Sequence, residues 1–202
     1  IGYHLDELIN DITKTTPASF EPTIDYVVTK IPRFTFEKFP GSKKFLTTSM
    51  KSVGEAMSIG RSFQESLQKG LRSLENDYTG LDNISNKTIE DLETLLREPI
   101  PERILIIGEA LRKKISITEI HNITGWDYWF LQQISGIIEV ENFIKKSGLP
   151  NNKDALFNIK SMGFSDLKLA YLLNCDVENI GNIRNENQVF PSFKRVDTCS
   201  AE

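Results

Sequence analysis

The sequence predicts a mainly α-helical protein that begins with a small α/β part. Helix-capping pairs recur from residue 62 onward, and apolar residues in that region repeat at spacings of three and four. Before it, residues 24–36 are rich in β-branched and aromatic side chains, which favour strands. With 39% apolar and 26% charged residues, the chain has the composition of a globular protein.

The first 50 residues predict one helix and an extended segment. Leu5, Leu8, Ile9 and Ile12 fall on one helical stripe, so a helix is expected over residues 3–12. Residues 24–36 are expected to be extended. Because Pro32 has no amide to donate, it should lie on an edge, at a bulge or at a break. Residues 38–44 contain Pro-Gly and predict a solvated turn.

The helix that follows separates the α/β part of the chain from the helical part. Ser62 and Glu65 have the spacing of a capping box, which predicts a helix start after a short strand or loop over residues 50–61. Gly54 and Gly60 should allow the chain to bend there, and residues 76–87 predict a polar boundary loop. The stripe expected to be buried is Phe63, Leu67, Gly70, Leu71 and Leu74; the residues expected to face water are Gln64, Glu65, Gln68, Lys69, Arg72 and Glu75.

The second half predicts a series of capped helices. The longest is expected over residues 128–147, after Asp127, with Glu141 as a polar interruption of its apolar stripe and Gly148 as its end. Three helices are expected before it: one that Thr88 and Asp91 cap and that stops before Pro99, one from Pro101 to about Leu111, and one that Ser116 and Glu119 cap and that Gly125 ends. Three short helices are expected after it: one that contains Leu156 and Ile159 and ends at Gly163, one from Ser165 to Leu173, and one from Asp176 to Ile183.

The charge balance argues against a nucleic-acid or anionic-membrane partner. The 24 basic and 28 acidic residues give a net charge of −4. No apolar run approaches the roughly 20 residues that span a bilayer. Cys175 and Cys199 share no metal-ligand spacing with His4 or His121, so they are interpreted as thiols of a reducing, cytoplasmic compartment. Starting on Ile1, the chain is expected to be a piece of a longer protein.

The last two short helices suggest a helix-turn-helix, and hence an independent helical binding module as the alternative function. The second helix, from Asp176, would expose a single basic residue, Arg184, whereas phosphate contacts need several. We therefore expect this pair to be packing rather than a DNA-binding element. A salt-dependent affinity for duplex DNA would favour the alternative.

Chemical motifs are sparse. The sequence has no P-loop, no dinucleotide fingerprint and no Ser-His-Asp order, so a self-sufficient enzyme is not expected. Both histidines are expected to be structural or solvated, and Lys43-Lys44 and Lys145-Lys146 to be solvated faces. The carboxylates of Glu37, Glu55, Glu65 and Asp77 are dispersed. No catalytic, cofactor-binding or metal-binding residue is predicted.

One aromatic cluster exceeds what a single helix face can bury. It comprises Trp126, Tyr128, Trp129 and Phe130, at the start of the longest predicted helix. Core packing is the default interpretation for each ring. Because the four rings exceed the area that one helix face can bury, self-association through them stays an alternative interpretation.

Three blocks of sequence closely resemble the large subunit of carbamoyl-phosphate synthase: residues 16–39, 47–71 and 193–202. That family has two ATP-grasp synthetase halves with a helical oligomerisation domain between them. The resemblance therefore implies a fold that is mainly α, a helical oligomerisation domain preceded by a small α/β remnant of an ATP-grasp domain. Residues 1–76 would end the first, carboxyphosphate-forming half, 77–191 would form the oligomerisation domain, and 192–202 would lead to the second half.

The resemblance also implies a function for the intact enzyme. It would make carbamoyl phosphate for arginine and pyrimidine synthesis from bicarbonate, ATP and ammonia that a glutaminase small subunit supplies, with Mg²⁺ or Mn²⁺. This segment would serve as scaffold, self-associate, and bind neither ATP nor metal, because the matching active-site blocks lie outside it. Its partners would be the rest of the large subunit and the small subunit.

The resemblance also bears on three individual residues and on the stability of the two parts of the chain. Lys51, Ser52 and Glu55 resemble a segment near the family's interior carbamate passage, which implies proximity and no demonstrated chemistry. Residues 1–76, separated from their partner strands, should expose strand edges and apolar faces. They should therefore be stabilised only by docking on the helical half or on another copy of the chain. The helical half should hold its own core, so a chain starting near Asp77 is expected to melt cooperatively by itself.

Overall fold

The computed structural model describes residues 2–20, 24–84 and 87–196. The chain divides into two compact units, one of Ile1–Tyr26 with Pro191–Glu202 and one of Val27–Phe190. Cys199 lies outside the described residues, as does most of the 193–202 block.

The helix expected over residues 3–12 is not formed. Among its described residues the first unit contains a single short 3-10 turn, η1 (Leu5–Glu7), and Ile9 pairs with Pro17 in an isolated antiparallel bridge. Asn10 Oδ1 accepts a hydrogen bond from the Ile12 amide, which fixes a turn instead of a helical repeat. The apolar stripe stays between 42 and 73% exposed. Without a packing partner among the described residues, so short a stripe does not sustain a helix.

The second unit begins with a two-stranded antiparallel sheet. β1 (Val27–Arg33) pairs with β2 (Gly54–Gly60), which confirms the extended prediction, and η2 (Phe36–Lys38) lies in their connection. Pro32 stands opposite Glu55 and is tolerated because each strand of a two-stranded sheet has an open edge. The inner face contacts α1 (Phe63–Arg72), where Thr29 and Ser66 hydroxyl oxygens are 2.6 Å apart.

The start of α1 is confirmed, but its capping box is only half formed. Ser62 Oγ accepts from the Glu65 amide at 3.2 Å, whereas the Glu65 carboxylate accepts from the Arg61 amide at 2.7 Å rather than from Ser62. Leu67 and Leu71 are buried as expected. The expectation that Gln68 faces water is wrong. It is fully buried, because α1 lies against both the sheet and the later helical part of the chain, where Gln68 Nε2 donates to the Met162 carbonyl at 2.9 Å.

The remaining helices confirm the predicted series. They are α2 (Ile89–Arg97), α3 (Arg103–Arg112), α4 (Ile117–Thr124), α5 (Tyr128–Ser147), α6 (Lys153–Ser161), α7 (Asp166–Leu173) and α8 (Val177–Glu186). Capping boxes form at Thr88 with Asp91 and at Ser116 with Glu119, and Gly125 ends α4 in the left-handed conformation. The cap expected at Asp176 makes no side-chain hydrogen bond.

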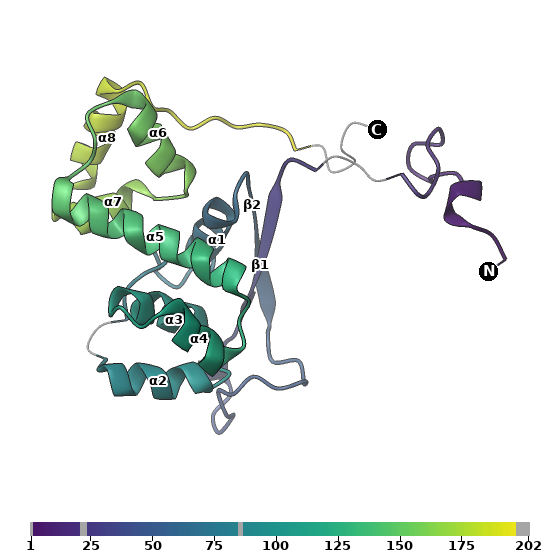
Figure 1. Ribbon diagram of the computed structural model, residues 1–202, viewed down its shortest axis with the longest axis horizontal. Helices are drawn as coiled ribbons and strands as arrows, with labels where there is room; N and C mark the ends of the chain where they lie inside the picture. Colours follow the sequence, from purple (N-terminus) through teal and green to yellow (C-terminus); the bar gives the residue numbers. More distant parts are fainter. Residues whose placement is uncertain (1, 21–23, 85–86, 197–202) are drawn as a thin grey trace. The chain divides into compact units, whose positions relative to one another are not determined.

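Helix α5 is the spine of this unit. Figure 1 shows it passing between the group formed by α2, α3 and α4 and the group formed by α6, α7 and α8. Five apolar residues of α5 are at most 3% exposed: Leu131, Ile134, Ile137, Ile138 and Ile144. Among the described residues the fold is thus eight α-helices with one two-stranded sheet, so the mainly α prediction is confirmed. No described helix is long and apolar enough to cross a membrane.

Candidate functional site

The start of α5 carries a cluster of rings that we call the aromatic corner: Phe63, Tyr128, Trp129 and Phe130. Phe63 comes from the first turn of α1, and its ring centroid lies 5.6 Å from that of Trp129 and 5.3 Å from that of Phe130. Trp129 and Phe130 meet edge to face at 5.0 Å. These separations are typical of favourable aromatic pairs. The corner therefore joins α1 to α5 through a fixed arrangement of rings.

The corner is nevertheless partly exposed to solvent. Tyr128 is 39% exposed, Trp129 50% and Phe130 41%, which confirms that the rings exceed what the helix face can bury. Apolar surface concentrated in this way is a feature of protein interfaces.

His121 supports the corner from α4. Its Nδ1 lies 2.7 Å from the Trp126 carbonyl oxygen, and its ring stacks on Tyr128 with centroids 4.1 Å apart. The predicted structural role of His121 agrees with this geometry.

Beneath the surface lies a network of buried charges. Arg112 of α3 donates from Nε to Glu141 at 2.8 Å, and Lys168 Nζ of α7 lies 3.1 Å from the same carboxylate. Lys168 and Glu141 are fully buried. Lys168 also reaches Asp82 at 3.2 Å, and both cations donate to the Leu81 carbonyl. The network thus connects the boundary loop to α3, α5 and α7. It also provides partners for Glu141, which the sequence showed only as a polar interruption of an apolar stripe.

A second ionic cluster lies where α6, α7 and α8 meet. The Asp166 carboxylate accepts from Lys160 Nζ at 2.7 Å and from Arg184 Nε at 2.9 Å. Burial alone would raise the pKa of Asp166, but the two cations outweigh it and hold the pKa below its ordinary value. Burial lowers the pKa of Lys160, and the contact with Asp166, which Arg184 shares, offsets only part of this effect. Arg184 is therefore engaged in packing, which weakens the helix-turn-helix alternative.

Two of the three residues noted for proximity have separate partners in the chain. Lys51 Nζ donates to the Phe45 carbonyl, and Glu55 pairs with Lys30 at 2.9 Å on the outer face of the sheet. Ser52 is half-buried. No group of three or more His, Cys, Asp or Glu in the described ranges could hold a metal ion. Cys175 is a half-buried free thiol.

Two surface hollows flank the turn between α7 and α8. Their volumes are about 540 and 530 Å³, and they share Ala170, Tyr171, Cys175 and Asp176. No Lys or Arg lines either hollow, so they lack the cations that a nucleotide phosphate requires.

Comparisons with known proteins show which family this helical region resembles. A sequence model of the "Carbamoyl-phosphate synthetase large chain, oligomerisation domain" matches residues 55–188. The chain is 51% identical to the carbamoyl phosphate synthase large chain of Brucella melitensis and 52% identical to that of Pseudomonas putida. It is 49% identical to the arginine-specific, chloroplastic large chain of Oryza sativa subsp. japonica. Each alignment covers all of this chain and 18–19% of the relative.

The matched region is of the oligomerisation class, a helical domain carried within a larger chain. The chain belongs to the carbamoyl-phosphate synthetase large-chain family, as the three resembling blocks indicated. It spans less than a fifth of the length of the curated relatives it matches.

Sequence reasoning found three rings of the aromatic corner, but it missed Phe63 and both ionic clusters. Trp126, the fourth ring of the predicted cluster, is partly buried against the core instead. The signal for the first ionic cluster was Glu141 on an otherwise apolar stripe. Its partners Arg112 and Lys168 lie 29 and 27 residues away, on other helices. Such pairings depend on how helices pack, which periodicity does not reveal.

Proposed function

We propose that this chain is the part of a carbamoyl-phosphate synthase large subunit that links the two synthetase halves and mediates association between subunits. The observation that carries the proposal is the exposed aromatic corner on a helical domain of the oligomerisation family. Rings held by fixed contacts lose little entropy when a partner covers them, which favours a specific interface. The buried charge network supports the same role, since it fixes the helices that present the corner.

Family membership supports a proposal for the wider enzyme. The intact large subunit would use ATP, with Mg²⁺ or Mn²⁺, to form carbamoyl phosphate from bicarbonate and ammonia, and a glutaminase small subunit would release that ammonia from glutamine. The product would serve arginine and pyrimidine synthesis in the cytoplasm. The arginine-specific names of two plant relatives support the first of these uses.

The domain boundaries are part of the proposal. We assign residues 1–76 to the end of the first synthetase half, 77–191 to the oligomerisation domain and 192–202 to the linker toward the second half. The family match begins at residue 55, and α1 shares one core with the later helices. By this assignment, α1 would be the element that docks the first half onto the helical domain.

The absence of a separate active site is tested by titrating the 202-residue chain with ATP and Mg²⁺ in a calorimeter. We expect no binding heat beyond dilution. A saturable ATP site on this chain would contradict the scaffold assignment.

Association is tested by light scattering over a concentration series of the same chain. The expected result is a mass that rises reversibly above 23.0 kDa. A constant monomer mass would mean that the assembling surface needs the rest of the large subunit.

A further inference from the structure

We propose that Arg72, together with Lys160 and Arg184, forms an oxyanion-binding site at the junction of α1 with the turn between α6 and α7. The group it would take is a carboxylate or a phosphate. This site is separate from the aromatic corner.

Close packing fixes the position of α1, the helix that carries Arg72. Gln68, one helical turn earlier on α1, donates to the Met162 carbonyl, at the end of α6. A Cβ on Gly163 would stand 3.0 Å from the backbone of Glu65, so α1 lies directly against the turn between α6 and α7. Arg72 lies in the last turn of α1, close enough to Asp166 and Lys160 to interact with both electrostatically.

The acids near Arg72 already have cationic partners. Asp166 accepts from Lys160 on one oxygen and from Arg184 on the other. Glu65 pairs with Lys69 and also accepts from the Arg61 amide. Within the described part of the chain, the Arg72 guanidinium has no hydrogen bond or ion pair. The cluster of Arg72, Lys160 and Arg184 around Asp166 therefore carries an excess of two positive charges.

An unpaired, half-buried guanidinium favours a specific kind of ligand. Its planar donors match the two oxygens of a carboxylate or phosphate, and partial burial strengthens such a contact relative to one in open water. Burial lowers the pKa of Arg72, although the negative charges of Asp166 and Glu65 act in the opposite direction. A further anion beside Arg72 would therefore offset the remaining free-energy cost of burying its charge. If the chain is a large-subunit segment, as proposed above, the natural source is an Asp or Glu side chain from the rest of that subunit.

The test is an NMR titration of the ¹⁵N-labelled 202-residue chain with sodium phosphate and, separately, with sodium acetate, at constant ionic strength set by chloride. The Arg72 Nε–Hε signal is identified by its loss in Arg72→Gln. We expect this signal to shift and saturate. Binding, followed by the backbone amides of the α6–α7 turn, should weaken at least tenfold in Arg72→Gln. Arg72→Lys, which keeps the charge and loses the planar donors, should be intermediate.

Arg97→Gln is the matched control, because Arg97 also lies in the last turn of a helix and is exposed. It should bind like the unmodified chain. A response to acetate at concentrations similar to phosphate assigns the site to a protein carboxylate, and a response to phosphate alone assigns it to free phosphate. No saturable shift with either anion, or equal binding by Arg72→Gln, would overturn the proposal. The signal is read at one residue, so the result does not depend on whether the chain self-associates.

Discussion

Glu141 shows how one buried acid organises this unit. It accepts from Arg112 and pairs with Lys168, and these cations also satisfy the Leu81 and Asp82 carbonyls. A buried charge is tolerated only when it is paired and hydrogen-bonded, so each member depends on the others. The boundary loop is consequently held by ionic contacts as well as by burial of Leu81.

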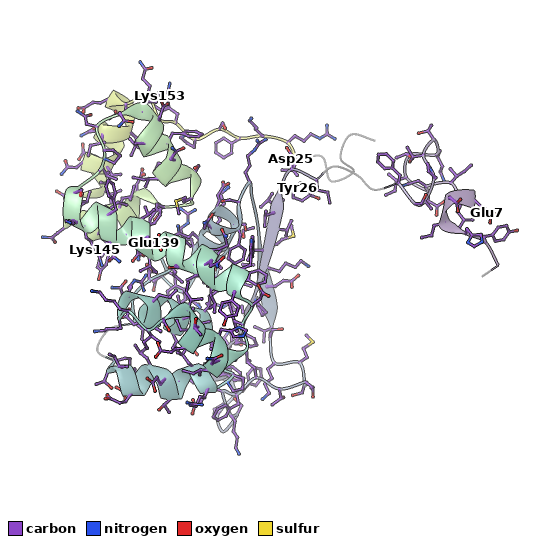
Figure 2. All side chains as sticks on the ribbon, in the orientation of Figure 1. Glu7, Asp25, Tyr26, Glu139, Lys145 and Lys153 are labelled. Atoms are coloured by element: carbon purple, nitrogen blue, oxygen red, sulfur yellow. The ribbon has the colours of Figure 1, made fainter. Side chains whose placement is uncertain are left out.

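Replacing this acid should be costly. Glu141→Gln removes the charge that neutralises Arg112 and Lys168, so we expect a loss of ~3–5 kcal/mol in the free energy of unfolding. Urea denaturation measures it. The control is Glu139→Gln on the same helix (labelled in Figure 2). Glu139 is exposed, so this substitution should change stability by less than about 0.5 kcal/mol. Equal effects of the two substitutions would show that the network contributes no stability.

Gly163 is required for the contact between α1 and the turn before α7. Its φ of +90° is unfavourable for other residues, and an added Cβ would press on the Glu65 backbone. Gly163→Ala should cost ~1–2 kcal/mol for the backbone conformation and a further ~1–3 kcal/mol for the contact. Gly125→Ala is the comparison, since Gly125 has φ +70° but open space around it. Thermal denaturation should place Gly163→Ala well below Gly125→Ala, and identical curves would argue against the close approach.

Helix α2 depends on its N-terminal cap. The Thr88 amide donates to Asp91 Oδ2 at 3.0 Å, and the Asp91 amide donates to Thr88 Oγ1 at 3.1 Å. Hydrogen bonds from the Thr88 backbone and side chain hold the pKa of Asp91 below its ordinary value. Because the folded-state pKa is the lower one, the carboxylate stabilises the fold above the ordinary value of ~3.9, and this contribution is lost as pH falls through the folded-state value.

Asp91→Asn should therefore destabilise the chain at pH 7 and make progressively less difference as the pH falls below about 4. Urea midpoints measured between pH 7 and pH 3 follow this convergence. Glu93→Gln, an exposed acid on the same helix, should leave the midpoint nearly unchanged at pH 7. A constant gap between Asp91→Asn and the unmodified chain at every pH would exclude the ionised cap as its cause.

The sequence predicted the later helices because caps and apolar periodicity agree there. Ser116 with Glu119, Asp127 and Gly125 mark ends that the structure reproduces. The prediction of a helix over residues 3–12 was wrong, because it rested on apolar periodicity alone, without a cap or a packing partner. The prediction that Gln68 faces water was wrong, because this polar residue, opposite the apolar stripe, lies against a second buried surface. Of the candidate site, the rings of the aromatic corner were visible in sequence, whereas Phe63 and the ionic partners depend on contacts between distant elements.

The cooperative unit of the molecule extends beyond the helices after the boundary loop. Leu67, Leu71 and Leu74 belong to the same core cluster as α3, α5 and α7. This sharing argues against the expectation that a chain starting near Asp77 holds its own core. Each buried leucine contributes ~1.5–3 kcal/mol, so their loss is large beside the stability of a small domain.

A chain of residues 27–190 should unfold in a single calorimetric transition, with equal van't Hoff and calorimetric enthalpies. A chain of residues 77–190 should be markedly less stable or unfolded, because α5 and the α6–α7 turn lose their contact with α1. Equal stability of the two chains would instead show that the helices after residue 77 hold a core of their own, as the sequence alone suggested.

The central claim is that the aromatic corner mediates association. The most direct measurement is light scattering on the 202-residue chain compared with Trp129→Ala and Phe143→Ala. Both side chains lie on α5 and both are 50% exposed, so the pair separates the corner from exposed aromatic surface in general. We expect Trp129→Ala to weaken association at least tenfold and Phe143→Ala to leave it unchanged. Association that survives Trp129→Ala, or that both substitutions weaken equally, would contradict the assignment of the corner as the interface.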